Sequence, residues 1–201
     1  EYARAALKAG RHVMLEKPPG ATLSEVHTLA ELADDAGLTI YATWHSREAA
    51  FVKAAKAWLS GKTIQSFTVT WHESVRKWHP GQDWVFEAGG MGIFDPGINA
   101  LSIVTEILPD AIHLKSAALD FPENCDTPIA AQLDFYHPHG GAVTADMNWD
   151  HEGDDVWQIE AVTDQGVMTL KNGGGLLLID GVIQAGAEDG LTGEYPNLYA
   201  K

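Results

Sequence analysis

The stretch at residues 89–99 reads Gly-Gly-Met-Gly-Ile-Phe-Asp-Pro-Gly-Ile-Asn and marks the start of a helix. Its glycines allow the backbone to turn sharply and to approach a ligand closely. Asp95 followed by Pro96 predicts that the aspartate caps the helix and that the proline occupies the first helical position. Apolar residues then recur at helical spacing from Ile98 to Leu108, so we expect one side of this helix to be buried.

The same stretch carries two polar side chains that favour a ligand site. Asp95 and Asn99 lie four residues apart, which places them on one face of the first helical turn. On spacing alone, the pattern is more typical of a capping aspartate and a solvated asparagine. The choice between these interpretations depends on the rest of the chain.

The elements that precede this stretch alternate between helix and strand. A helix ends at Gly10, a short strand follows at 12–15, a helix with a capping-box pattern covers 22–37, and a second strand covers 38–42. Alternating helices and strands with short links are typical of a parallel α/β layer. We therefore predict that residues 1–43 form the end of such a layer.

From residue 44 onward the pattern changes. Ser46 is expected to cap a helix that Gly61 ends, and strand patterns dominate after the glycine-rich helix. The predicted strands cover residues 63–73, 113–121, 129–136, 142–149, 156–163, 167–170 and 176–179. Strands that follow helices predict an antiparallel sheet with helices on one face. Residues 44–201 are therefore expected to form an α+β domain with a large, mostly antiparallel open sheet.

Charge and cysteine content narrow the functional classes. Acidic residues outnumber basic residues 28 to 13, which gives a formal net charge of −15. This balance repels phosphate backbones and anionic membrane surfaces, so neither nucleic acid nor a membrane is an expected partner. Cys125 is the single cysteine, which precludes an internal disulfide and favours a reducing, cytoplasmic compartment. No apolar run approaches the roughly 20 residues of a membrane span.

Lys17 is a second candidate functional residue, because it directly follows the first predicted strand. In parallel α/β layers, ligands bind beyond the carboxyl ends of the strands. Pro18 and the proline after it restrict the local backbone, and a cis peptide there is one way to aim the lysine inward. A solvated lysine in a surface turn is the alternative interpretation.

Residues 6–18, Ala-Leu-Lys-Ala-Gly-Arg-His-Val-Met-Leu-Glu-Lys-Pro, together with residues 89–99, resemble two signatures of one family. This is the glucose-fructose oxidoreductase/inositol dehydrogenase family of NAD(P)-dependent sugar and polyol dehydrogenases. The resemblance implies that residues 1–43 are the end of a Rossmann domain, and that the Gly-x-Gly-x-x-Gly fingerprint for the pyrophosphate lies upstream of Glu1. The chain also starts within a helical pattern without a methionine, so we expect it to be part of a longer polypeptide.

Within the family the chain looks most similar to bacterial dehydrogenases of L-arabinose or D-galactose. The resemblance therefore implies oxidation of the C1 hydroxyl of an aldose to the lactone, with hydride transfer to NAD or NADP. It implies catalytic roles for Lys17 and Asp95, and contacts to the cofactor from Glu16, Lys17 and Pro18. Asn99 occupies the place of the family's usual catalytic histidine and cannot titrate. The proton therefore passes to Lys17, to Asp95 or to the pair, and the sequence does not choose.

Three further residues are expected to bind the substrate. Trp78 and Trp157 offer broad apolar faces on which a sugar ring can stack, and core packing is the alternative for both. The resemblance suggests that His45 contacts a sugar hydroxyl, although a purely structural histidine fits the pattern nearly as well. No metal site is expected, and His137 and His139 are expected to decorate an exposed hairpin.

Two other functions remain open at this stage. A catalytically silent relative that binds sugar or cofactor and acts as a regulator is compatible with Asn99. A structural role of the sheet in forming a homo-oligomer is compatible with the dehydrogenase function and is implied by the resemblance.

Overall fold

The computed structural model describes residues 1–184 and 190–200. It divides into two compact units, Glu1–Trp44 and His45–Lys201, which are considered separately. Within the described part, no helix is both long and apolar enough to cross a bilayer.

The first unit is a small parallel α/β layer. It contains α1 (Tyr2–Lys8), β1 (Val13–Glu16), α2 (Leu23–Asp35) and β2 (Ile40–Thr43). The two strands pair in parallel, from Val13 opposite Ile40 to Glu16 opposite Thr43. The predicted cap of α2 is confirmed, because Thr22 Oγ1 accepts a hydrogen bond from the Glu25 amide at 3.3 Å. Leu7, Leu29 and Ala33 form the core of this unit.

The second unit is built on one eight-stranded sheet with the strand order β10-β9-β8-β7-β3-β6-β5-β4. Its strands are β3 (Ile64–His72), β4 (His113–Asp120), β5 (Ala130–Tyr136), β6 (Ala142–Asn148), β7 (Val156–Thr163), β8 (Gly166–Lys171), β9 (Leu176–Ile179) and β10 (Val182–Ile183). Among the strand pairs that the structure describes in this sheet, β3–β6 alone is parallel, so the predicted mostly antiparallel sheet is confirmed.

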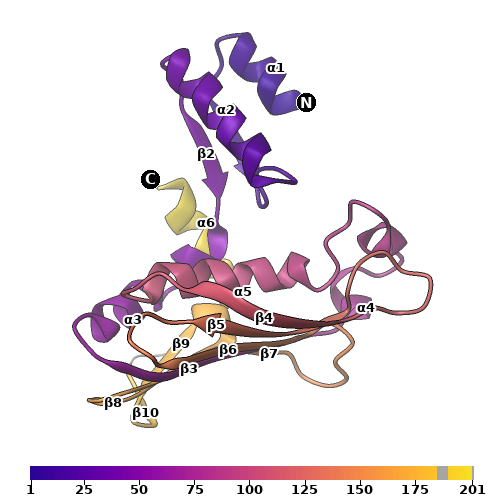
Figure 1. Cartoon of the computed structure of the whole chain (residues 1–201). Helices are drawn as coiled ribbons and strands as arrows, with labels where there is room; N and C mark the ends of the chain where they lie inside the picture. Colours follow the sequence, from indigo (N-terminus) through magenta and orange to yellow (C-terminus); the bar gives the residue numbers. More distant parts are fainter. Residues whose placement is uncertain (185–189, 201) are drawn as a thin grey trace. The chain divides into compact units, whose positions relative to one another are not determined.

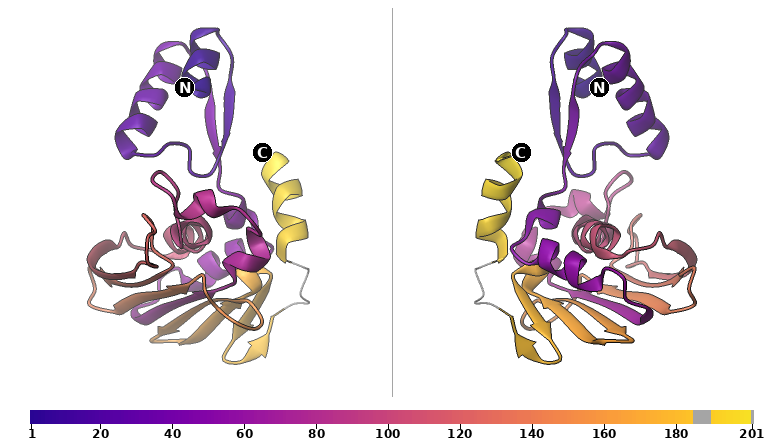
Figure 2. Two further views of the ribbon diagram at one scale, coloured as in Figure 1. Left: turned by 90° about the vertical axis from the view of Figure 1, so that its right-hand side faces the viewer. Right: turned by 90° about the vertical axis from the view of Figure 1, so that its left-hand side faces the viewer.

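Helices cover one face of this sheet, as Figures 1 and 2 show for α3 (Val52–Leu59) and α5 (Phe94–Ile107). Side chains alternate along the central strand β3, so that Phe67, Val69 and Trp71 are buried beneath the helices. The other helical segments described in this unit are η1 (His45–Glu48), α4 (Val75–Trp78), η2 (Asp83–Phe86), η3 (Asn172–Gly174) and α6 (Gly190–Tyr199).

The predicted cap of α5 is wrong. The helix begins at Phe94, so Asp95 lies within its first turn and Pro96 is not its first residue. A backbone turn starts the helix instead: Gly92 has φ +53°, and its carbonyl accepts the Asp95 amide at 3.0 Å. The Ile93 amide donates to the Pro128 carbonyl at 2.7 Å, which anchors this turn to the segment before β5. The Asp95 carboxylate is therefore not used as the cap.

Ser46 does not cap a helix either. It lies inside η1, and α3 begins later, after Phe51. The Phe51 amide donates to the Gly174 carbonyl at 3.0 Å, so a contact with η3 sets the start of α3. The strand β10 and the helix α6 were not predicted from the sequence. Two glycines and Pro196 disfavour a helix in α6, so its conformation depends on tertiary contacts such as buried Leu198.

Candidate functional site

Asp95 is held by a histidine that the sequence analysis did not single out. Its Oδ2 atom lies 3.1 Å from Nε2 of His79, the residue that directly follows α4. The His79 ring packs edge-on against Trp149, with ring centroids 5.2 Å apart, and against Trp84 at 6.3 Å. The aromatic contacts thus fix the imidazole that orients the Asp95 carboxylate.

A second carboxylate, Glu73, lies buried just after β3 and was not predicted. Its two oxygens accept hydrogen bonds from two indoles: Oε1 from Trp149 at 3.0 Å, and Oε2 from Trp157 at 2.7 Å. Burial raises the pKa of Glu73, the two indole hydrogen bonds oppose that rise, and the charges of Asp155 and Asp95 add to it. The sequence does contain a signal for this position. Glu73 is a polar residue two positions after the inward-facing Trp71, so its side chain is expected on the same, inward side of the strand.

Trp78 and Trp157, the two tryptophans predicted to bind substrate, lie together. Trp157 on β7 pairs across the sheet with Trp71, and their rings stack at 5.9 Å. Its other neighbour is Trp78, whose ring centroid lies 5.5 Å away. Trp78 is 37% exposed, and Lys77 Nζ lies 5.1 Å from its ring. The cluster therefore combines buried packing with one accessible aromatic surface.

His45 begins η1 and is almost enclosed. Its Nδ1 atom is 2.6 Å from Oε2 of Glu194 on α6, and its ring stacks on Tyr195 with centroids 5.3 Å apart. Both members of this hydrogen bond are buried, with exposures of 8% for His45 and 2% for Glu194. Glu194 lies on a helix that the sequence analysis missed, so its pairing with His45 was not foreseen.

Asn99 lies one turn after Asp95 on α5 and is half-buried. Its carbonyl accepts a hydrogen bond from Ser102 Oγ at 2.7 Å. Between the two residues, Gly97 packs closely on the sheet, because a Cβ there would lie 2.8 Å from Met147 Sδ. This close approach sets the height of the first turn of α5 above β6.

Lys17, Glu16 and Pro18 belong to the first unit, at the carboxyl end of β1. Lys17 and Pro18 are half-buried, Glu16 is exposed, and the Lys17–Pro18 peptide bond is cis. Next to them, Thr43 Oγ1 at the end of β2 donates to the Leu15 carbonyl at 3.0 Å. All three residues thus stand at the edge where parallel α/β layers bind ligands.

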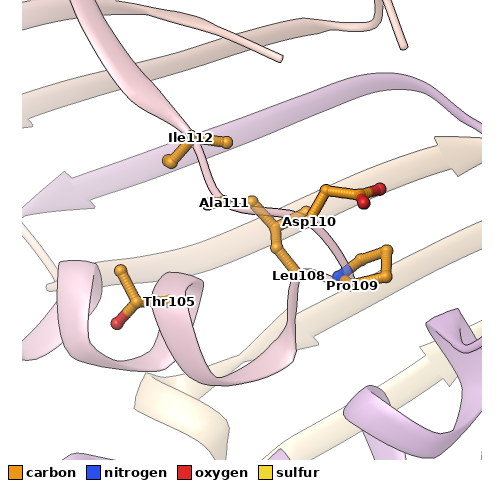
Figure 3. A pocket seen from close by; sticks show the side chains of 6 residues that line it. All are labelled: Thr105, Leu108, Pro109, Asp110, Ala111 and Ile112. Carbon is orange, nitrogen blue, oxygen red and sulfur yellow. The ribbon is translucent and has the colours of Figure 1, made fainter. Parts of the chain in front are cut away.

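Two cavities in the second unit lie near opposite ends of α5. One, of about 490 Å³, is lined by residues that include His79, Phe86 and Cys125. The other, of about 330 Å³, lies where α5 ends and β4 approaches, as Figure 3 shows. At 1.5 Å per residue, the end of α5 is roughly 20 Å from Asp95 along the helix axis, so the second cavity is not part of the Asp95 site.

The histidine-rich hairpin differs from the expectation. His139 is exposed, but the side chain of His137 is 1% exposed and lies 3.9 Å from Asp110 through Nε2. The prediction of an exposed position is therefore wrong for His137, which packs under the hairpin. Within residues 1–184 and 190–200, no three histidine, cysteine or carboxylate side chains are grouped so that they could hold a metal ion.

Comparisons with known proteins identify this architecture. The fold is that of a Rossmann-type, NAD-binding oxidoreductase whose second domain carries a large, mostly antiparallel sheet. Residues 1–43 match the model of the glucose-fructose oxidoreductase/inositol dehydrogenase family, described as an oxidoreductase family with an NAD-binding Rossmann fold. The resemblance to this family and the fold class inferred from the sequence are confirmed.

Individual relatives extend the match over nearly the whole chain. A galactose 1-dehydrogenase from Pseudomonas fluorescens is 43% identical over 96% of this chain and 62% of its own length. The crystal structure of a D-galactose-1-dehydrogenase from Rhizobium etli superposes with a TM-score of 0.92 at 52% identity, covering 98% of this chain and 62% of that one. The chain thus spans about three fifths of the length of these relatives.

A more distant structure shares the fold alone. An inositol dehydrogenase homologue from Azotobacter vinelandii, complexed with NAD+, matches with a TM-score of 0.76 at 19% identity. It covers 92% of this chain and 51% of that one.

Proposed function

We propose that this chain is the substrate-binding part, with the end of the dinucleotide-binding part, of an NAD(P)-dependent aldose 1-dehydrogenase. The substrate is an aldose of the D-galactose or L-arabinose type. The observation that carries the proposal is the Asp95 carboxylate, oriented by His79 in the first turn of α5 beside a cluster of indoles. The two relatives named galactose 1-dehydrogenases support the same substrate class.

The proposed chemistry is removal of a proton from the C1 hydroxyl of the sugar by Lys17, Asp95 or the pair. The hydride acceptor for the C1 hydrogen would be supplied by a bound nicotinamide cofactor, and the product would be the lactone. The residues present fit one end of a dinucleotide, because Glu16 ends β1, and Lys17 and Pro18 follow it at the ligand-binding edge of the layer. Asn99 donates and accepts hydrogen bonds to orient the sugar, and it does not titrate.

Trp78, Trp157 and His45 are proposed to bind the sugar. The half-exposed face of Trp78 suits stacking on the apolar face of a pyranose, and Trp157 supports that ring from behind. His45 is proposed to contact a hydroxyl group.

The test uses the complete gene product, assayed with NAD and NADP against D-galactose, L-arabinose, D-fucose and D-glucose. We expect reduction of one or both nucleotides with at least one of the first three sugars. Lys17→Met should abolish turnover while circular dichroism shows an intact fold. Lys8→Met, at an exposed position of the same unit, is the matched control. Undiminished turnover by Lys17→Met would refute the role of Lys17.

Asn99 favours one alternative, a catalytically silent relative that binds sugar or cofactor as a regulator. Binding of a sugar or nucleotide measured by calorimetry, without reduction of either nucleotide by any of the four sugars, would support this alternative over the dehydrogenase.

We also propose that copies of the chain associate through the uncovered side of the large sheet. All eight residues of the edge strand β4 are exposed, and Leu114 and Leu119 are among the large apolar side chains at the surface. A long exposed edge with apolar side chains is an aggregation hazard unless another chain covers it. Sedimentation should show a dimer or larger species at micromolar concentration, and Leu119→Lys should weaken it. Leu23→Lys, at an exposed site of the first unit, is the control; a monomeric wild type would refute association.

A cytoplasmic location is proposed from the single cysteine, Cys125, which suits a reducing compartment. Cell fractionation with an antibody against the protein tests it.

A further inference from the structure

His45 and Glu194 form a buried pair between segments 149 residues apart in the chain. The imidazole Nδ1 and the carboxylate Oε2 are separated by 2.6 Å, and the Ser46 hydroxyl lies 3.4 Å from the same nitrogen. A buried carboxylate is costly unless it accepts hydrogen bonds, and His45 meets this requirement for Glu194. Because the carboxylate accepts, Nδ1 of His45 carries the proton and donates it.

The helix that carries Glu194 is attached to η1 by a second hydrogen bond that does not involve the imidazole. Asn197 Nδ2 on α6 donates to the Glu48 carbonyl at 3.1 Å. Tyr195, next to Glu194, stacks its ring on His45 with an angle of 13° between the planes. The hydrogen bond to Glu194 and the stack on Tyr195 together determine the rotation of the His45 ring.

This arrangement determines the chemistry that the ring can offer to a ligand. A neutral imidazole has one donor and one acceptor nitrogen, and the partner of one nitrogen sets the tautomer. With Nδ1–H directed to Glu194, Nε2 is the acceptor. We propose that Glu194 is a positioning residue that holds His45 as a fixed acceptor, through Nε2, for one hydroxyl group of the sugar. This inference rests on the proposed function and assigns Glu194 a part in it.

A purely structural explanation is that the pair only docks α6 onto η1. Substitutions of Asn197 and Glu194 distinguish the two explanations, because Asn197 contributes to the docking of α6 without touching His45. Glu194→Met removes the acceptor while keeping a side chain of similar length. Glu194→Gln keeps an acceptor, its amide oxygen, at the same place.

The first measurement is steady-state kinetics of the complete gene product. Glu194→Met should raise the KM for the sugar about tenfold, which is the loss expected for one oriented hydrogen bond, and leave the KM for the nucleotide unchanged. Glu194→Gln should rescue most of this loss, and Asn197→Ala should leave the KM for the sugar unchanged. An equal loss in Asn197→Ala, or an unchanged sugar KM in Glu194→Met, would overturn the positioning role.

The second measurement needs no turnover. Nitrogen-15 spectra of histidine-labelled protein in mildly alkaline solution distinguish the two neutral tautomers, and His45→Gln identifies the signals of His45. Wild type, Glu194→Gln and Asn197→Ala should show the Nδ1–H tautomer, and Glu194→Met should lose it. A wild-type Nε2–H tautomer would overturn the proposal. If no aldose is oxidised, the proposed function fails while this tautomer result still stands, so the two failures are distinguishable.

Discussion

Nε2 of His79 lies 3.1 Å from Oδ2 of Asp95, which joins the residue after α4 to the first turn of α5. The contact explains how a carboxylate that is not used as a helix cap is nevertheless oriented. It also connects Asp95 to the buried carboxylate of Glu73, because Trp149 contacts the His79 ring and donates its indole N–H to Glu73. Changes in His79, Trp149 or Glu73 should therefore affect Asp95.

Replacement of His79 by phenylalanine should lower kcat. The ring keeps its packing against Trp149, but Asp95 loses the imidazole nitrogen that lies 3.1 Å from its carboxylate. Losing a polar contact to a charged group costs about 1.5–3 kcal/mol, so we expect turnover to fall about tenfold to a hundredfold. Steady-state kinetics with saturating galactose checks this. His139→Phe, at an exposed histidine of the hairpin, is the control; equal kcat values in both variants would show that Asp95 does not depend on His79.

Glu73 should make the second unit less stable as the pH rises. Its pKa in the folded protein is raised above the ordinary value of 4.5, so the folded state keeps a proton that the unfolded state has already lost. Stability is therefore highest below the unfolded pKa and decreases as the pH rises through the raised pKa. Glu73→Gln removes this titration, and its stability relative to wild type should increase with pH across that window.

Urea unfolding at a series of pH values, followed by tryptophan fluorescence, measures this difference. The tryptophans are suitable reporters, because all of them except Trp44 lie in the second unit. Glu87→Gln at an exposed site is the matched control. A pH-independent difference between Glu73→Gln and wild type would contradict the prediction.

Replacement of Trp157 by phenylalanine should destabilise the second unit. The substitution keeps an aromatic ring between Trp71 and Trp78 but removes the indole N–H that donates to Glu73 Oε2 at 2.7 Å. Leaving a buried carboxylate oxygen without this donor costs about 1–3 kcal/mol. The free energy of unfolding in urea measures the cost. Trp84→Phe, at a residue 54% exposed, should change it by less than half as much.

Gly92→Ala should be among the most destabilising single substitutions in the second unit. Gly92 has φ +53°, and a Cβ there would lie 2.2 Å from the Pro128 carbonyl oxygen, so the backbone itself must move. We expect a loss of about 2–4 kcal/mol in the free energy of unfolding. Gly61→Ala is the control, because Gly61 has φ +74° but open space around its Cβ position. Because of the left-handed conformation, Gly61→Ala should lower the free energy of unfolding by only about 1 kcal/mol. An equal loss in Gly92→Ala would disprove the steric argument.

Local patterns were sufficient for most of the fold. The strands of the large sheet alternate between buried and exposed side chains, and this period of two can be read directly from the residues of β3, β5 and β6. The capping box at Thr22 and the turn at Gly92 both depend on hydrogen bonds between residues only a few positions apart in the chain. Such signals survive in the sequence because the interactions behind them are local.

Helix starts were less predictable where a distant segment decides them. Asp95 and Ser46 both look like caps, yet backbone hydrogen bonds from Ile93 to Pro128 and from Phe51 to Gly174 set where α5 and α3 begin. The glycines and the proline of α6 likewise disfavour the helix that the structure contains. In each case, contacts between segments far apart in the chain outweigh local preference.

The sequence by itself determined the family resemblance, most of the order of helices and strands, and the candidacy of Lys17 and Asp95, because these depend on short motifs and on periodicity. Only the tertiary structure decided which partners surround the candidate residues: His79 beside Asp95, two indoles on Glu73, and Glu194 on His45. The reason is physical. A buried carboxylate needs hydrogen-bond donors in space, and folding can supply them from any point in the chain.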